Sequence, residues 1–488
     1  MRSWIVWLCH SAGEVSAEAK LLLAGMIRHY DDAPVRGVDK SIGKHLGMSA
    51  RVVSREVAEL VSAKHLMSVP ASPTGSRGRP VVVYRVRPEL LHYSAVVKPV
   101  AWDDKDDGGH FEALIEVLLA DPSEVSGGSS ERGQGPSREG AAERLSASNR
   151  LLLMVLLGLA DRNGVVRGWG PSELSRLLGL TAGQLAGQVQ KLLALGYLRA
   201  AVSGVSGSRL FGRRPGAYFL NLSHSSYKGA VPEVVLVFPV EEVDLYHRSQ
   251  GNGRVIYRLT VQMGRQAPSE YIKGLMLSAG FADMGEVMRR LAPFFNGIGT
   301  STLSEYFQMR LEAYATHMLS SGPSSGDDLM MSKMREVMAK EAFNCVEEDL
   351  KGGQKTYIQL VEYLAHRQAE LLRGAIDRIG RLAGERWKTL HLEDATYALV
   401  PAVASSSGRY IALCIMPASG AGGEATCFIA GRNAEHGTLR EERNLSKEEM
   451  WEYGLMTRQF KRLPKQDPVV LREPLSTTAA KVLSDDGS

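Results

Sequence analysis

The chain has 488 residues and is close to electrically balanced, with 58 Lys and Arg against 54 Asp and Glu and 44% hydrophobic residues. This length predicts roughly two to four domains of ordinary size. No run approaches the ~18 uninterrupted apolar residues of a membrane span, so we expect no membrane partner. The chain has four cysteines, Cys9, Cys345, Cys414 and Cys427. They form no CxxC pair, which argues against a zinc site or a disulfide scaffold and favours a cytoplasmic protein.

One pattern occurs twice in the N-terminal half. The stretch "IGKHLGMSARVVSREVAELVSAKHLMSV" from Ile42 aligns without a gap with "LSRLLGLTAGQLAGQVQKLLALGYLRAA" from Leu174. Upstream, "SAEAKLLL" at Ser16 matches "SASNRLLL" at Ser146, and downstream "GRPVVVY" matches "RRPGAYF". Agreement in this order over a whole domain indicates a duplicated unit.

Each copy predicts the same series of elements. A serine caps a first apolar helix, a second helix ends at a glycine suited to left-handed backbone, and a Ser or Thr caps a third helix. Two strands follow, joined by a loop rich in Gly, Ser and Arg. The residues concerned are Ser16, Asp39–Leu46, Gly47 and Ser49 in the first copy and Ser146, Pro171–Leu178, Gly179 and Thr181 in the second; the inward positions of the third helix are Val53, Val57 and Leu60, and Leu185, Val189 and Leu192.

Both copies resemble the winged helix-turn-helix domains of bacterial transcription regulators of the MarR-like and PadR-like kind. The "LG-S/T" turn, the "VVSREVAEL" helix and the "GRP…VYRV" strand carry the resemblance, over about residues 14–92 and 144–224. It implies that the third helix enters the major groove of double-stranded DNA and that the wing follows the phosphates. The implied DNA-binding residues are Ser49, Arg51, Val52, Ser54, Arg55, Arg77 and Arg79 in the first unit, and Thr181, Gly183, Gln184, Gln188, Arg209, Arg213 and Arg214 in the second.

The second unit departs from this pattern. Its third helix contains Gly183 and Gly187 and no arginine near its start. Glycine inside a helix costs about 0.5–1 kcal/mol relative to alanine, and base reading commonly relies on arginine. Gln184 and Gln188 remain able to read adenine.

Charge separates DNA binding from the alternative that both units are folded protein-binding spacers. Residues 1–100 contain 14 Lys and Arg against 8 Asp and Glu, and residues 146–228 contain 10 against 2. Residues 231–460 are net acidic. A basic excess confined to the two units favours contacts with phosphates.

The rest of the chain predicts a different organisation. Residues 101–145 form an acidic linker rich in Gly and Ser that includes a short amphipathic helix, and residues 461–488 form a disordered tail. Residues 229–460 predict a mostly helical α+β domain, with strands such as "EVVLVFPV", "RVIYRLTVQM" (254–263) and "RYIALCIMPA". Its long amphipathic helix, Tyr357–Trp387, has a stripe that favours self-association into a homo-oligomer or binding of a partner or effector. The predicted fold class is therefore mainly α with small β-sheets, with winged units at residues 1–100 and 146–228.

The leading functional hypothesis is a sequence-specific DNA-binding transcription regulator of bacterial type. A replication or partition protein of a plasmid, phage or mobile element is the alternative that the sequence leaves open. The C-terminal half shows no catalytic signature, so we do not expect an enzyme, and no cofactor or metal is indicated.

Overall fold

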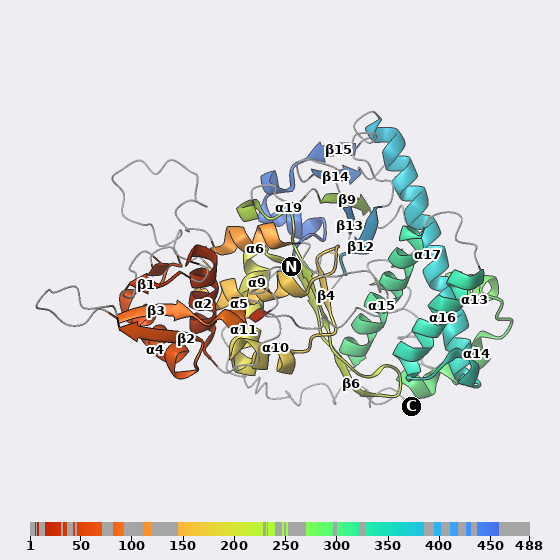
Figure 1. Cartoon of the computed structure of the whole chain (residues 1–488). Coiled ribbons are helices and arrows are strands. Elements are labelled where there is room, and N and C mark those ends of the chain that lie inside the picture. Colours follow the sequence, from red (N-terminus) through yellow and green to blue (C-terminus); the bar gives the residue numbers. More distant parts are fainter. Residues whose placement is uncertain are drawn as a thin grey trace, which may run out of the picture.

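The description rests on a computed structural model of the chain. It describes residues 5, 7–8, 15–30, 33–36, 42–43, 46–70, 82–91, 111–119, 145–227, 231, 233–239, 246–247, 250–251, 270–295, 300–321, 328–384, 395–401, 410–417, 426–430 and 437–457. The first repeated unit lies at one end, the second in the middle, and the C-terminal helices at the other end (Figure 1).

The first unit is built on two longer helices and a small sheet, with a short helix α5 (Pro88–Leu91) after the last strand. Helix α2 (Ala17–Tyr30) and helix α4 (Ala50–Ser62) pack on strands β1 (Val35–Arg36), β2 (Leu66–Pro70) and β3 (Val82–Val86), which pair in the order β1-β3-β2. Of the predicted second helix, only Ile42, Gly43 and Leu46 are described; Ile42 and Gly43 are helical, and the Leu46 N–H donates to the Ile42 carbonyl at 2.9 Å. Gly47 follows with φ of 67°, the left-handed conformation that the sequence predicts.

The second unit repeats this arrangement. It contains α9 (Ala147–Leu159), β4 (Val165–Arg167), α10 (Pro171–Leu178), α11 (Ala182–Leu195), β5 (Leu198–Val202) and β8 (Ala217–Leu220). Its sheet has the order β4-β8-β5, equivalent to that of the first unit. The predicted basic loop is itself a hairpin of β6 (Val205–Ser208) and β7 (Gly212–Arg214). Left-handed backbone at Phe211 (φ 70°) and Gly212 (φ 58°) forms its turn.

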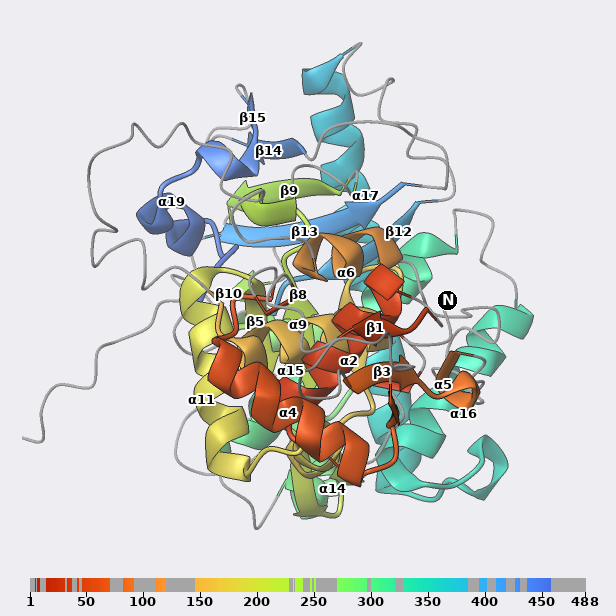
Figure 2. The same ribbon diagram turned by 60° about the vertical axis from the view of Figure 1, so that its left-hand side comes forward.

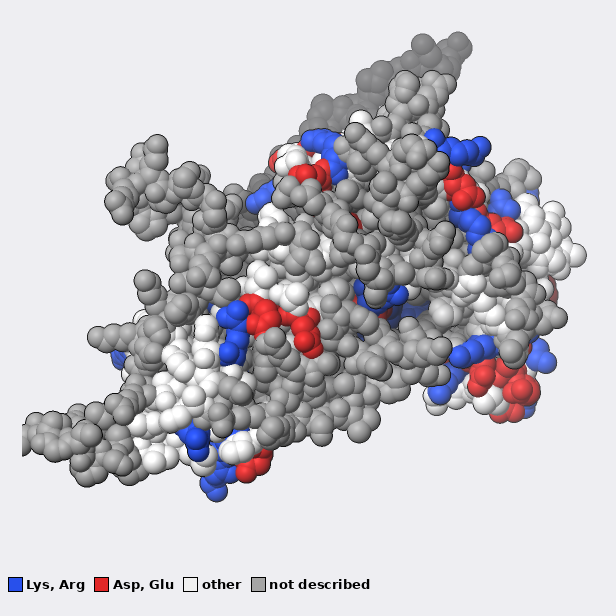
Figure 3. Space-filling view, turned by 45° about the horizontal axis from the view of Figure 1, so that its top comes forward, with Lys and Arg blue, Asp and Glu red and all other residues white. Residues whose placement is uncertain are grey.

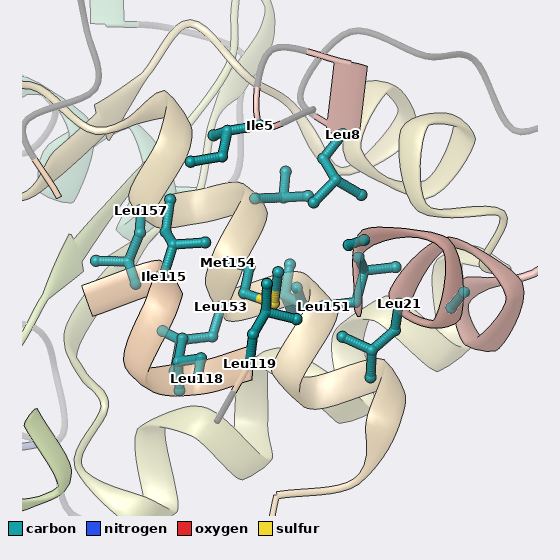
Figure 4. Close-up of a cluster of buried hydrophobic side chains, with 14 of the residues drawn as sticks. Ile5, Leu8, Leu21, Ile115, Leu118, Leu119, Leu151, Leu153, Met154 and Leu157 are labelled. Carbon is teal, nitrogen blue, oxygen red and sulfur yellow. The ribbon is translucent and has the colours of Figure 1, made fainter. Parts of the chain in front are cut away.

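The two units share one hydrophobic core instead of standing apart on a linker. Helices α2 and α9 pack on each other, and α6 (Glu112–Leu119), from the segment between the units, packs on α9. Figure 4 shows this cluster, with Leu21, Ile115, Leu151 and Met154 meeting from the three helices. The glutamate Glu116 of α6 also forms an ion pair with Arg28 of α2. Of the predicted linker at residues 101–145, the structure describes residues 111–119 and residue 145.

The C-terminal half is built on a five-stranded sheet. Strands β9 (Val234–Pro239), β12 (Thr396–Leu399), β13 (Tyr410–Met416), β14 (Thr426–Ala430) and β15 (Gly437–Arg440) have the order β12-β13-β9-β14-β15, with only β9 and β14 parallel among them. Successive β9 residues such as Val235 and Leu236 belong to two different cores, so the sheet is buried on both faces. The predicted strand at residues 254–263 and the tail at 461–488 lie outside the described residues.

The helices that the structure describes between β11 (Gln250–Gly251) and β12 are α13 (Glu270–Ser278), α14 (Met284–Phe295), α15 (Thr300–Ser320), α16 (Asp328–Phe343) and α17 (Gly353–Ala383), and the short helix α19 (Lys447–Glu452) follows β15. Helix α17 packs on α14, α15 and α16. Its predicted oligomer stripe is used inside the chain, since Leu360, Leu364 and Ile379 are buried in the two C-terminal cores. That stripe therefore no longer supports self-association.

The sequence boundary near residue 228 does not separate two cores. Val165, Phe211 and Phe219 of the second unit belong to the same buried cluster as Phe307 and Tyr357 of the C-terminal half. The two parts share a core because one face of the sheet in the second unit is apolar, and the C-terminal half buries that face. The second unit and the C-terminal half thus form one structural body.

The predicted fold class, mainly α with small β-sheets, is confirmed. Among the helices that the structure describes, none combines the length and the apolar character that crossing a bilayer requires.

Candidate nucleic-acid interface

Helix α4 has one buried side and one exposed side. Val53, Val57 and Leu60 are buried, as predicted, while Arg51, Ser54 and Arg55 are exposed. Ser49 caps the helix, and its hydroxyl accepts the Val52 N–H at 3.4 Å. The structure therefore brings the predicted residues of this helix to one surface, except that Val52 is half-buried and packs on the core.

A buried carboxylate holds α4 against α2. Glu56 is fully buried, and the hydroxyl of Ser16 lies 2.6 Å from its Oε2. The same hydroxyl lies 2.8 Å from Oε2 of Glu59 and can donate to only one of the two, while the Ser16 N–H donates to Glu59 Oε1 at 2.6 Å. Partial burial opposes ionisation of Glu59, but the hydrogen bonds from Ser16 outweigh it and lower the pKa of Glu59. These contacts fix the position of α4.

Arg55 contacts this network from outside. Its Nε donates to Oε1 of Glu56 at 2.6 Å, and this hydrogen bond, together with the charge of Glu56, raises the pKa of Arg55. The Arg55 side chain is nevertheless 68% exposed. Glu56 thus orients a guanidinium that still faces solvent.

Helix α11 has the same division with different surface chemistry. Leu185, Val189 and Leu192 are buried as predicted, and Thr181, Gly183 and Gln184 are exposed. Thr181 forms a capping box, in which its hydroxyl accepts the Gln184 N–H at 3.2 Å and Gln184 Oε1 accepts the Thr181 N–H at 2.8 Å. A Cβ added at Gly183 or Gly187 would meet nothing within 4 Å, so these glycines leave bare backbone on the exposed side.

The two glutamines of α11 differ. The amide NH2 of Gln184 points away from the cap that its oxygen makes, whereas Gln188 is half-buried. Oε1 of Gln188 is buried and accepts no hydrogen bond from any residue that the structure describes. Gln188 is therefore less available for reading a base than the sequence predicts.

The second wing packs on the C-terminal half. Leu210 and Phe211 at its tip are buried, and the Phe211 ring contacts Tyr306 edge-on at 5.1 Å. The Phe211 N–H donates to the Ala342 carbonyl at 2.7 Å, and Arg214 donates to the carbonyls of Lys340 at 2.8 Å and Glu341 at 3.3 Å.

This placement corrects the expectation for Arg214. The carbonyls at the C-terminal end of α16 carry partial negative charge, so they attract the guanidinium. Arg214 is engaged inside the chain and is not free for a phosphate. Arg209 and Arg213 are exposed, and the first-wing residues Arg77 and Arg79 lie outside the described residues.

Two buried cations at the junction of the repeated units were missed at the level of the sequence. Lys20 of α2 and Arg150 of α9 are buried and donate to backbone carbonyls of the opposite unit. The signal was present, since "SAEAKLLL" and "SASNRLLL" place both cations at the same position of the repeat. A buried charge in an apolar helix generally has a partner.

One face of the molecule carries charges of mixed sign (Figure 3). On the face that Figure 3 brings forward, basic and acidic side chains lie next to each other. No group of three or more His, Cys, Asp or Glu residues within the described ranges is placed to hold a metal ion.

Comparisons of the chain with protein-family models, with curated proteins and with solved structures found no match.

Proposed function

We propose that this chain is a double-stranded DNA-binding protein that reads sequence through α4 and α11 and acts as a transcription regulator of the winged helix-turn-helix kind. One observation carries the proposal. Two copies of the same unit each present an N-capped third helix that is fixed by its buried side and exposed on the other. Such a helix, preceded by a helix and a tight glycine turn, has the geometry that enters a major groove.

The chemistry of the exposed sides supports the proposal. Arg51 and Arg55 of α4 provide guanidinium groups that suit the O6 and N7 atoms of guanine. On α11, the bare backbone at Gly183 and Gly187 allows close approach, and the Gln184 amide can donate to a base edge. In both Figure 1 and Figure 2, α4 and α11 lie in the lower half of the molecule. A regulator of this kind works in the cytoplasm.

The test begins with selection from a random duplex library at fixed salt, followed by fluorescence anisotropy on the enriched sequence. Replacing Arg55 by alanine is expected to cost ~1–3 kcal/mol of binding free energy and to relax preference at one base pair, because a bidentate contact to guanine is lost. Arg289→Ala is the matched control: it removes one exposed arginine from α14, remote from α4.

Folding is expected to survive Arg55→Ala, since the side chain is mostly exposed. An unchanged base preference and an affinity equal to that of Arg289→Ala would contradict the role of α4. Failure to enrich any sequence, together with equal affinity for all duplexes, would contradict sequence-specific DNA binding altogether.

A further inference from the structure

The contact between the two repeated units is reciprocal. Nζ of Lys20 donates to the carbonyl of Leu177, near the end of α10, and Nη1 of Arg150 donates to the carbonyl of Leu46 at 3.3 Å. Lys20 and Arg150 occupy equivalent positions of the repeat, four residues after Ser16 and Ser146. Leu46 and Leu177 both lie in the last turn before the glycine that precedes the third helix. Leu46 aligns with Leu178, so the two acceptor carbonyls differ by one position of the repeat. Each unit therefore receives a cation from its neighbour at the end of its second helix, in an approximately reciprocal way.

A second contact joins equivalent positions directly. The hydroxyl of Ser148 donates to Oε1 of Glu18 at 3.1 Å, and these residues each lie two positions after the capping serine of their unit. When two units are related by a two-fold axis, a residue of one unit that contacts a given position of the other is matched by the same contact in the opposite direction, and two equivalent residues contact each other only beside the axis. Repeats arranged head to tail show neither the reciprocal contacts nor the contact between equivalent residues. The axis therefore passes between α2 and α9 near Glu18 and Ser148.

These contacts also fix the two exposed helices relative to each other. Lys20 is 1% exposed and Arg150 is 8% exposed, so both carbonyl contacts lie inside the protein, where a charge requires polar partners. Both partners lie at the C-terminal end of the helix before α4 or α11, where the helix dipole is negative. Gly179 lies close to the same junction, since a Cβ there would come within 2.8 Å of the Val15 carbonyl.

From this approximate two-fold relation, and resting on the DNA binding proposed above, we infer that one copy of the chain binds one DNA site composed of two half-sites in inverted orientation. Two DNA-reading helices that are related by a two-fold axis require two half-sites that are also related by a two-fold axis, which means an inverted repeat. The two half-sites differ in sequence, because α4 presents Arg51 and Arg55 whereas α11 presents Gln184 and bare backbone. The site is thus an imperfect inverted repeat with a guanine-containing half and a weakly specified half.

The first experiment uses the full chain and a duplex selected from a random library. Its two half-sites are rebuilt in inverted order, in direct order, and in inverted order with about 5 bp inserted, which is half a helical turn. We expect at least about tenfold tighter binding to the uninterrupted inverted duplex and, by light scattering, one chain per duplex. Equal affinity for the direct order, or two chains per duplex, would overturn the inference while leaving DNA binding intact. Absence of any selected duplex would instead count against the proposed function.

The second experiment tests whether the reciprocal contact sets the orientation. Lys20→Met removes the charge and keeps the shape of the chain, so we expect preference for the inverted over the direct duplex to fall at least about fivefold. Arg162→Met is the control, because Arg162 donates to the Pro417 carbonyl at 2.6 Å, away from the interface of the units. Unchanged preference in a folded Lys20→Met protein would contradict the role of the contact. If that variant does not fold, the duplex series on the unaltered chain still decides the inference.

Discussion

Arg199 joins the second unit to the C-terminal half through two buried ion pairs. It is 1% exposed, and its guanidinium binds Glu442 at 2.7 Å and Glu233 at 2.8 Å. Burial disfavours the charged form, but the two carboxylates outweigh it and raise the pKa of Arg199. The Ser223 hydroxyl also donates to Glu233 at 2.6 Å.

Arg199→Met is expected to lower the free energy of unfolding by ~3–5 kcal/mol, because two carboxylates then stay buried without their cation. Urea denaturation is the measurement. Adding Glu233→Gln and Glu442→Gln to that variant is expected to recover part of the loss. A single variant as stable as the unaltered chain would show that the ion pairs have no net effect.

We expect protonation of His224 to make the free energy of unfolding depend on pH. It stacks on Tyr197 with ring centroids 3.8 Å apart, its Nε2 donates to the Leu195 carbonyl at 3.1 Å, and its Nδ1 accepts the Ser226 N–H at 3.2 Å. Burial lowers the pKa of His224 to about 4, with a smaller contribution from the charge of Arg199. The ordinary pKa of about 6.5 applies in the unfolded chain, which therefore binds more protons between these values.

Stability from this group is complete above pH 6.5 and is lost as the pH falls towards 4, by up to ~3 kcal/mol. His224→Gln removes the titrating group, so the difference in unfolding free energy between the variant and the unaltered chain should shrink as the pH falls through this window. Parallel stability curves for the two proteins between pH 4 and 6.5 would refute the assignment.

At the scale of elements, α11 combines low helix propensity with an exposed side. Gly183 and Gly187 have helical backbone and free space around a would-be Cβ, so alanine at both is expected to stabilise the helix by about 0.5–1 kcal/mol per site. If bare backbone approaches DNA there, the same double variant binds DNA more weakly. Gly374→Ala in α17, which also meets nothing within 4 Å, should raise the melting temperature without changing binding. Tighter or equal DNA binding by the Gly183→Ala, Gly187→Ala protein would contradict a close approach of the α11 backbone to DNA.

Elements whose signals are local could be predicted from the sequence, and those fixed by distant residues could not. Ser49, Thr181 and Gly179 mark helix ends through contacts within a few residues, and the structure has the ends there. The hydrogen bonds of Arg214 to the carbonyls of Lys340 and Glu341 could not be predicted, because these residues lie more than 120 positions further along the chain. The DNA-facing roles of these residues remain predictions.

At the scale of the whole molecule, the domain division from the sequence would favour a stable fragment ending near residue 228. The structure predicts the opposite, because this fragment lacks Glu233, Glu442 and the cover over Leu210 and Phe211. We expect it to aggregate or to unfold without cooperativity, measured by circular dichroism and limited proteolysis. A chain ending at residue 460 is the control and should unfold cooperatively. A cooperative, protease-resistant fragment ending at residue 228 would show that the second unit folds alone.

The contact between α2 and α9 also bears on how the chain is made. Ten residues of α2 are buried, and one side of that helix is covered by α9, whose Ser148 lies 130 residues after Glu18. Ribosomes add about 5–20 residues per second, so α2 waits on the order of 10 s after its own synthesis for the helix that covers it. Throughout that interval the nascent chain carries an apolar helix side without its native partner, and chaperones have time to bind there. The unit synthesised first completes its core only after the second unit has emerged.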